Sequence, residues 1–330
     1  MDTSRRSFLT RSSALLLGAA AAPWAVPAYA VNYPDKAVCF YIPYPPGAAT
    51  DNLGRMAADL YSQAFGQAFV VENRGGGGTT IGTRALATSA PDGYTIGMVD
   101  SAFTINPGLR GSSLPYDTLK DFAPISLMAT APFAMVVHPS VKATDLKSFI
   151  ALAKAQPGIL SYASPGMGTA PHLAGEQLRQ QAGIDIQHVP YRGGGTVFTD
   201  LLGGQVEFAF ATVPTLLQHI KAGRLRAIAV TSAQRVSSLP DVPTFAEAGL
   251  PGVDTSPLFG LVAPANVPAS IVNQLSATLA KSVQTGELHS KLMGLGFDPI
   301  GSTPSEFEHR IRNEVAKWTE VIRRGGFKAE

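Results

Sequence analysis

One stretch decides the fold: Tyr41-Ile42-Pro43-Tyr44-Pro45-Pro46-Gly47-Ala48-Ala49-Thr50-Asp51-Asn52. It begins at the end of an apolar, strand-like run and leads into apolar residues at helical spacing. Pro45 and Pro46 lack an N–H group and fix φ, so the strand must end before them. Gly47 permits a tight turn, and Thr50 or Asp51 is the predicted helix cap. The stretch therefore predicts a strand, a stiff loop and a helix N-terminus whose free N–H groups attract an anion.

The composition is that of a globular chain with little net charge. Of 330 residues, 45% are hydrophobic, which is enough for two domains. The chain has 26 Lys and Arg and 24 Asp and Glu; three of the basic and one of the acidic residues lie in the first 30 positions, so the remainder is formally neutral. Such a balance argues against nucleic-acid binding. The single cysteine, Cys39, excludes an internal disulfide, and its apolar neighbours predict a buried thiol.

The N-terminal segment has the pattern of a twin-arginine export signal. Ser4-Arg5-Arg6-Ser7-Phe8-Leu9 precedes a short apolar segment, and Ala28-Tyr29-Ala30 matches a signal-peptidase site. The alternative is a membrane anchor, but two prolines interrupt the apolar segment, which is too short to span a bilayer. We therefore expect residues 1–30 to be a signal peptide cleaved near Ala30 and the protein to be periplasmic.

After the opening loop, strand and helix patterns alternate along the chain, which predicts parallel sheets covered by helices. A nearly continuous apolar run, 123–137, is broken by Pro132 and predicts an extended segment that crosses between two domains. A later apolar run, Leu258 to Ala263, is long enough to carry the chain back. The predicted first lobe therefore comprises 31–131 and 254–330, and the second comprises 132–253.

Two further glycine-rich segments precede predicted helices. Gly166-Met167-Gly168-Thr169-Ala170-Pro171 has Thr169 as its predicted cap and a proline in the first helical turn. The run Gly75 to Gly78 lacks the spacing of a dinucleotide fingerprint and predicts a turn that lets a helix pack close to the sheet. We find no Gly-X-Ser-X-Gly elbow, metal triad or catalytic-cysteine context, so we expect no enzyme, no cofactor and no metal.

Short motifs then recur in a fixed order. They are Tyr33-Pro34-Asp35-Lys36, Pro43-Tyr44-Pro45-Pro46-Gly47, Val71-Glu72-Asn73-Arg74, Ala90-Pro91-Asp92-Gly93-Tyr94-Thr95, Tyr162-Ala163-Ser164, His172-Leu173-Ala174-Gly175-Glu176, Val189-Pro190-Tyr191, Asp200-Leu201-Leu202-Gly203-Gly204-Gln205 and Leu239-Pro240-Asp241-Val242-Pro243-Thr244. Each is weak alone, but the ordered set closely resembles the solute-binding proteins of tripartite tricarboxylate transporters, the Bug family. The likeness covers nearly all of the chain after the leader.

The resemblance implies a type II periplasmic-binding-protein fold, with two α/β lobes joined by a two-strand hinge. It also implies an organic anion, usually a carboxylate, held between the loops Tyr44–Asp51 and Ser164–His172, and delivery to a membrane permease with one large and one small subunit. We expect a monomer. The predicted ligand-binding residues are Tyr44, Gly47, Ala48, Ala49, Thr50, Asp51, Ser101, Ser164, Gly168, Thr169, His172 and Thr212.

Some alternatives stay open at this stage. Asp51 either braces its loop or contacts the ligand, and His172 with Glu176, one helical turn apart, has the spacing of two metal ligands. The same cleft also suits a sensor that signals to a membrane receptor. Four residues depart from the family pattern. Ala48 is expected to narrow the φ range of its loop, whereas Met167, Ala211 and Leu258 make the pocket more apolar and favour a carboxylate with an apolar or aromatic body.

Overall fold

The computed structural model describes residues 33–255 and 257–327. The chain divides into an N-terminal unit, Met1–Tyr33, and the unit Pro34–Glu330, to which the helices and strands below belong. The predicted signal peptide and its cleavage point near Ala30 lie outside the described residues. Within the described residues, no helix has both the length and the apolar character needed to cross a membrane.

The first sheet has six strands in the order β11-β4-β10-β3-β1-β2. Its strands are β1 (Val38–Ile42), β2 (Phe69–Asn73), β3 (Thr95–Asp100), β4 (Phe122–Thr130), β10 (Leu258–Pro264) and β11 (Asp298–Pro299). Strand β1 runs parallel to β2 and β3, whereas β10 is antiparallel to β3 and β4. The helices of this lobe are α1 (Ala49–Phe65), α2 (Thr80–Ala87), α3 (Ala102–Arg110), α8 (Ala269–Thr285), α9 (Glu287–Leu295) and α10 (Pro304–Gly325).

The second sheet has five strands in the order β7-β6-β8-β5-β9. They are β5 (Phe133–Val137), β6 (Ser161–Ser164), β7 (Gln187–Pro190), β8 (Phe208–Thr212) and β9 (Arg226–Val230). Strand β6 runs parallel to β7 and β8, and β5 is antiparallel to β8 and β9. The helices of this lobe are α4 (Leu146–Ala155), α5 (Ala170–Ala182), α6 (Gly194–Leu202) and α7 (Val213–Lys221).

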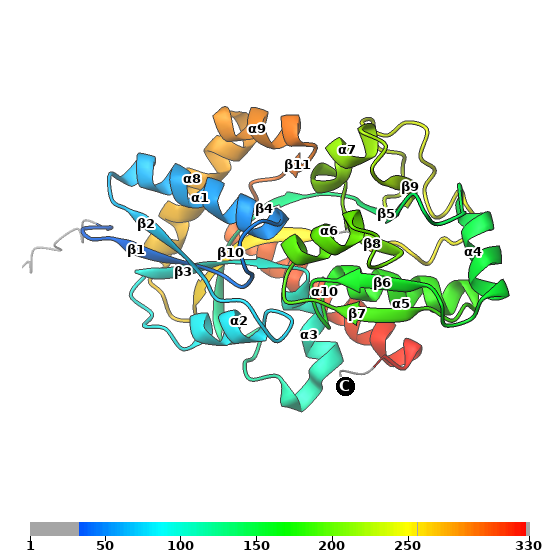
Figure 1. Cartoon of the computed structure of the whole chain (residues 1–330). Coiled ribbons are helices and arrows are strands. Elements are labelled where there is room, and N and C mark those ends of the chain that lie inside the picture. The colour runs from blue at the N-terminus through cyan, green and yellow to red at the C-terminus, as the bar shows by residue number, and fades with distance from the viewer. Residues whose placement is uncertain (1–32, 256, 328–330) are drawn as a thin grey trace, which may run out of the picture. The chain divides into compact units, whose positions relative to one another are not determined.

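The two sheets are linked where the sequence predicted a crossing. Strand β4 of the first sheet leads through Ala131 and Pro132 into β5 of the second, as the ribbon in Figure 1 shows. The Pro132 carbonyl accepts a hydrogen bond from the N–H of Val213, the first residue of α7, at 3.0 Å. The chain returns through β10. The exact lobe boundaries at 131/132 and 253/254 remain a prediction.

Two local predictions were wrong. The sheets are mixed rather than parallel, because β10 and β5 each enter their sheet from the other lobe and run antiparallel to both of their neighbours there. Cys39 is only partly buried, and its Sγ lies 3.5 Å from the Glu72 carboxylate. Side chains of β1 alternate between the core and the outer face, and Cys39 falls on the outer face.

Apolar faces of the helices close the core of the first lobe. On α10, Phe307, Ile311 and Trp318 are buried, at the spacing that the sequence predicts. Opposite the Phe307 ring, Gly260 of β10 leaves no room for a side chain: a Cβ there would lie 2.2 Å from the ring. Gly260 is therefore required by packing.

We predict that Gly260→Ala lowers the free energy of unfolding by about 1–3 kcal/mol, because a buried ring and a new methyl group cannot share the same space. Gly294→Ala is the matched control, since a Cβ at that exposed position on α9 meets nothing within 4 Å; it should be neutral or stabilising by up to about 1 kcal/mol. Urea unfolding of both variants measures the difference, and equal stabilities would contradict the packing argument.

Candidate ligand-binding cleft

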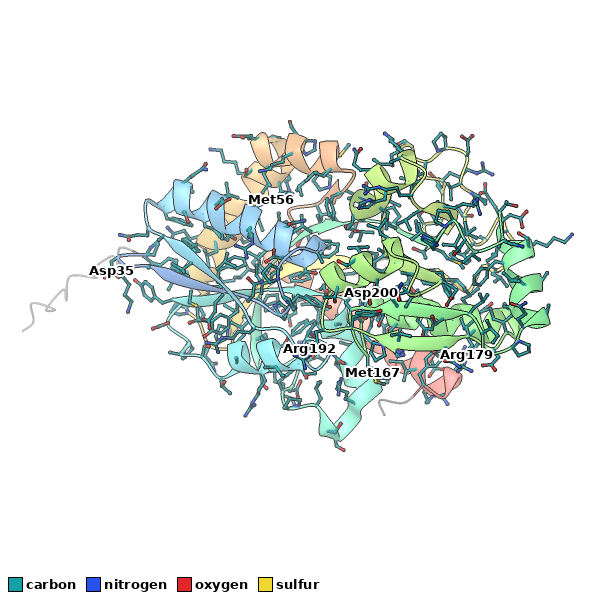
Figure 2. The ribbon with its side chains drawn as sticks, viewed as in Figure 1. Asp35, Met56, Met167, Arg179, Arg192 and Asp200 are labelled. Atoms are coloured by element: carbon teal, nitrogen blue, oxygen red, sulfur yellow. The ribbon has the colours of Figure 1, made fainter. Side chains whose placement is uncertain are left out.

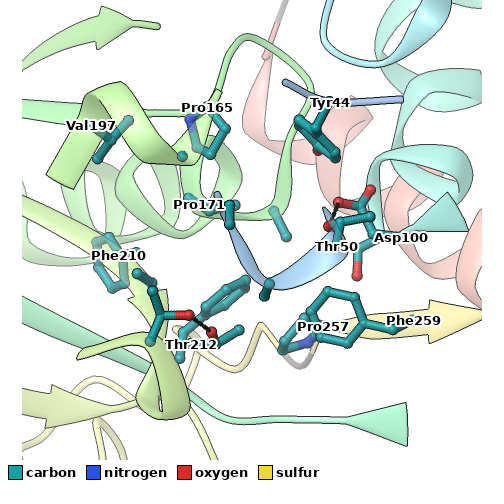
Figure 3. Close-up of a pocket in the computed structure, with 18 of the residues that line it drawn as sticks. Tyr44, Thr50, Asp100, Pro165, Pro171, Val197, Phe210, Thr212, Pro257 and Phe259 are labelled. Atoms are coloured by element: carbon teal, nitrogen blue, oxygen red, sulfur yellow. Dashed lines mark hydrogen bonds between the residues drawn. The ribbon is translucent and has the colours of Figure 1, made fainter. Parts of the chain in front are cut away.

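A cavity of about 610 Å³, counting the part open to solvent, lies between loops and helix ends of the two lobes. Figure 3 shows Tyr44, Thr50 and Asp100 on one side of it and Val197, Phe210 and Thr212 on the other. It is lined by Tyr44, Ala48, Ala49, Thr50, Asp100, Ser101, Phe133, Pro165, Ala170, Pro171, Gly194, Val197, Phe198, Phe210, Ala211, Thr212, Thr215, Pro257 and Phe259.

The lining includes the first residues of several helices. Ala49 begins α1, Ala170 begins α5 and Gly194 begins α6, and none of these helices has a side-chain hydrogen bond at its N-cap. Their first-turn N–H groups carry partial positive charge and need acceptors. Helices α4 and α10, which do not reach the cavity, each have a complete capping box. Helices α2, α8 and α9, which do not line the cavity, also lack a side-chain cap, so what distinguishes the cavity is that the uncapped starts of α1, α5 and α6 meet there.

Two other helices that begin at the cavity use their first N–H group internally. The Ala102 N–H of α3 donates to Asp100 Oδ1 at 3.0 Å, and the Val213 N–H of α7 donates to the Pro132 carbonyl. Among the lining residues, all within the described part of the chain, Asp100 alone is charged, and none is Lys, Arg or His. Anion attraction in this cavity would therefore come from backbone dipoles and hydroxyl groups.

The walls between these polar groups are apolar. Aromatic side chains and prolines make up much of the lining: Phe133, Phe198, Phe210, Phe259, Pro165, Pro171 and Pro257. Ala211, one of the predicted departures from the family pattern, lies in the lining, whereas Leu258 is buried in the core and Met167 lies elsewhere. The apolar walls suit a ligand with a hydrocarbon body.

The loop before α1 is held by Asp51. Its Oδ2 accepts from the Gly47 N–H at 3.1 Å, its Oδ1 accepts from Asn73 Nδ2 at 2.8 Å, and Arg55 pairs with it at 3.1 Å. Burial opposes ionisation, but the hydrogen bonds from Arg55, Asn73 and Gly47 prevail and lower the pKa of Asp51. Asp51 is 2% exposed and does not line the cavity. It therefore acts as a brace for the loop.

The helix cap was predicted two or three residues too late. The N-cap of α1 is Ala48, so Thr50 and Asp51 lie in the first turn. Because Asp51 stands at the third helical position, its side chain reaches back to the preceding loop, as the acidic residue of a capping box does. This arrangement leaves the N-terminal N–H groups of α1 facing the cavity without a side-chain cap.

The second loop is braced in a similar way. Thr169 Oγ1 donates to the Gly166 carbonyl at 2.6 Å, and Ser164 Oγ donates to the same carbonyl at 3.1 Å. The His172 ring accepts from the Gly168 N–H at 3.3 Å. Thr169 is the N-cap of α5 but makes no side-chain cap bond, because its hydroxyl is turned to the loop. These side chains shape the loop and leave the cavity to its backbone.

The structure thus divides the predicted site residues into two groups. Tyr44, Ala48, Ala49, Thr50, Ser101 and Thr212 line the cavity, whereas Gly47, Asp51, Ser164, Gly168, Thr169 and His172 do not. Sequence reasoning missed Asp100, Gly194 and Thr215 among the polar lining. Asp100 ends a strand and Gly194 opens a helix after a glycine run, so the sequence pattern could have identified both as lining residues. Whether these residues bind a ligand stays a prediction.

His172 and Glu176 serve the protein's own structure. Glu176 accepts from the Tyr162 hydroxyl at 2.9 Å and pairs with Arg179 at 2.8 Å. The His172 ring lies 4.3 Å from the ring of His188, which contacts Ser164 Oγ at 2.6 Å. Burial lowers the pKa of His172 to about 4 and, together with the neighbouring His172, lowers the pKa of His188 to about 3. Both imidazoles are therefore neutral near pH 7.

The lobes also contact each other beside the cavity, at Gly78 and the Met167 loop. A Cβ added to Gly78 would lie 1.9 Å from the Met167 carbonyl oxygen. The Gly78 carbonyl accepts from Asn106 Nδ2 at 3.0 Å, which fixes the glycine loop. Met167 and Arg192, labelled in Figure 2, line a second space between these loops. The glycine run was predicted to form a turn that lets a helix pack close to the sheet. It also contacts the Met167 loop of the other lobe.

The fold and cleft define a class of protein. Two α/β lobes joined by two strands, with a cavity of helix N-termini between them, form the type II fold of periplasmic binding proteins. A family model described as "Tripartite tricarboxylate transporter family receptor" matches residues 53–327, and the chain belongs to that family. The family predicted from the ordered motifs is thereby confirmed.

Individual relatives agree. Protein BugT of Bordetella pertussis is 35% identical over 305 residues, which cover 92% of this chain and 94% of BugT. The structure of the periplasmic binding protein BugD matches with a TM-score of 0.86 and 30% identity, covering 90% of this chain and 100% of BugD. The R. palustris protein Rpa4515, solved with adipate, matches with a TM-score of 0.86 and 31% identity, covering 90% of this chain and 99% of that protein.

The buried histidines predict a pH dependence. Their pKa values in the folded state lie below the usual 6.5, so the unfolded chain binds more protons. Their contribution to stability is complete above about pH 6.5 and is lost as the pH falls from there toward about 3. We expect the free energy of unfolding to decrease over this range and His188→Gln to flatten the decrease.

Urea unfolding measured between about pH 7 and pH 4 checks this prediction. His309→Gln, at an exposed position on α10, is the control. A wild-type stability that stays constant over this range, or the same decrease in His188→Gln, would show that the imidazoles are not the cause.

The contact at Gly78 predicts an effect on affinity. Gly78→Ala would push the Met167 loop away and widen the cleft, so we expect about tenfold weaker binding of the carboxylate that most raises the melting temperature. Gly223→Ala is the matched control, because Gly223 has φ +67 against +61 for Gly78 but nothing within 4 Å of an added Cβ. Calorimetric titration measures the affinity of both variants. Equal affinities would show that the Gly78 contact does not affect binding.

Proposed function

We propose that this protein captures a small organic carboxylate in its cleft in the periplasm and delivers it to a two-subunit permease of the tripartite tricarboxylate type. The observation that carries the proposal is the cavity itself: helices α1, α5 and α6 begin there without side-chain caps, and no cation is present among its described lining residues. A carboxylate supplies the acceptors that these N–H groups lack.

The energies are adequate for a small ligand. A hydrogen bond to a charged acceptor contributes about 1.5–3 kcal/mol, and a partly buried helix terminus adds up to about 2 kcal/mol. Ser101 Oγ accepts from the Leu258 N–H at 3.0 Å, so its own hydrogen is left to donate. A few such bonds reach the roughly 8 kcal/mol of a micromolar complex.

The apolar walls support a carboxylate with a hydrocarbon or aromatic body. Phe133, Phe210 and Phe259 provide contact surface without fixed hydrogen-bond geometry. The adipate in the structure of the relative Rpa4515 is a carboxylate of this kind, with an apolar chain. The ligand of this chain is therefore expected to be a carboxylate on an apolar body.

Binding without catalysis is also part of the proposal. The described lining residues contain no His, Lys or Cys, and Ser101, the one serine, faces the Leu258 N–H rather than a base. General acid–base or nucleophilic chemistry needs a nucleophile within reach of such a base. The expected monomer, the twin-arginine export and the permease partner complete the proposal.

We predict that purified protein without its leader gains several degrees of melting temperature with at least one carboxylate from a panel of aliphatic and aromatic mono- and dicarboxylates, because a ligand stabilises the state that it binds. The carboxamide of each acid is the control, since it keeps the shape and loses the charge. A panel without a shift, or equal shifts with the carboxamides, would overturn the proposal.

A further inference from the structure

We propose that the ligand carries its carboxylate at one end and a hydrogen-bond donor, a hydroxyl or an ammonium group, at the other, and that Asp100 selects this donor. The inference rests on the proposed function of the cleft and names the substrate class within it. It separates this protein from a receptor for symmetrical dicarboxylates.

Asp100 is built into the cavity as an acceptor. It ends β3, and its carboxylate receives the Thr50 hydroxyl at 3.1 Å and the Ala102 N–H at 3.0 Å. Burial raises the pKa of Asp100, and hydrogen bonds from Tyr44, Ala102 and Thr50 oppose that rise. All three neighbours are donors, which suits an ionised carboxylate. Such a group offers about four lone-pair positions, so it can also accept from a ligand.

The charge at this end of the cavity is not paired with a cationic side chain. Neither the lining nor the hydrogen bonds of Asp100 include a cationic side chain, and the described residues around it contribute only neutral donors. A second ligand carboxylate placed here would meet a like charge in a partly desolvated space, which disfavours binding. An ammonium or hydroxyl group would instead fill the open acceptor positions.

The opposite end of the cavity suits the carboxylate. Figure 3 shows Thr212 on the side away from Asp100. Thr212 Oγ1 and Thr215 Oγ1 lie 2.8 Å apart, and whichever hydroxyl donates in this pair, the other retains its hydrogen for a ligand. The uncapped starts of α5 and α6, at Ala170 and Gly194, belong to the same lobe and add backbone donors. The two ends therefore differ in charge preference.

The apolar walls between the two ends favour a ligand whose middle part is apolar. Phe210, Pro257 and Phe259 offer no hydrogen-bond partner to a substituted chain. The geometry points to ω-hydroxy or ω-amino carboxylates with an aliphatic or aromatic body. Dicarboxylates of equal length are expected to bind less well.

The test compares ligands that differ only at the far end. Calorimetry and thermal shift are measured with caproate, ω-hydroxycaproate, ω-aminocaproate and adipate, and with the matching butyrate and para-substituted benzoate sets. In the series that fits best, we expect the hydroxy or amino ligand to bind at least about tenfold more tightly than the dicarboxylate. A wild-type preference for the dicarboxylate overturns the inference without touching the proposed function. Failure of every carboxylate to bind overturns both.

A variant identifies Asp100 as the cause. Asp100→Asn keeps the shape but removes the charge, so the preference over the dicarboxylate should fall to within about threefold. Asp92→Asn is the matched control: Asp92 precedes β3, is exposed, and accepts the Tyr94 N–H at 2.9 Å, as Asp100 accepts that of Ala102. An unchanged preference in a folded Asp100→Asn protein overturns the role of Asp100. If that variant does not fold, the wild-type ligand ranking alone decides.

Discussion

A helix that starts without a cap leaves backbone N–H groups that must find an acceptor. In this protein three such helix starts, those of α1, α5 and α6, lie at the same cavity. The glycine and proline loops before these helices hold their N-termini in position. The rest of the structure, two sheets with capped helices such as α4 and α10 on their outer sides, is the support for this arrangement.

The side chains nearest the helix ends work mainly on the loops. Asp51 ties Gly47 and Asn73 together, and Thr169 ties back to Gly166. A stiff loop costs little further entropy when a ligand binds, so the bracing raises the affinity that backbone donors can deliver. Recognition by main chain also frees the lining side chains to set selectivity, and Asp100 is the one with a charge among the described lining residues.

Much of the fold was predictable from the sequence, since turn chemistry and apolar periodicity act locally. The loop at Gly47, the run broken at Pro132 and the buried face of α10 follow from such rules. Helix α3 was missed because Pro107 lies inside it, and the mixed sheets were missed because strand direction depends on distant pairing. In the site, residue type indicated the loops, but the direction of each hydroxyl is set by carbonyl groups that no sequence pattern reveals, as at Thr169.

The bond between the Val213 N–H and the Pro132 carbonyl has a mechanical consequence. It fixes the start of α7, and with it the neighbouring Thr212, to the strand segment that joins the lobes. Asp100 belongs to the other lobe, at the end of β3. We therefore expect the length of a molecule that touches both ends of the cavity to set the angle between the lobes about Pro132. Ligands that are too short or too long would fill the cleft and yet leave the lobes at a different angle.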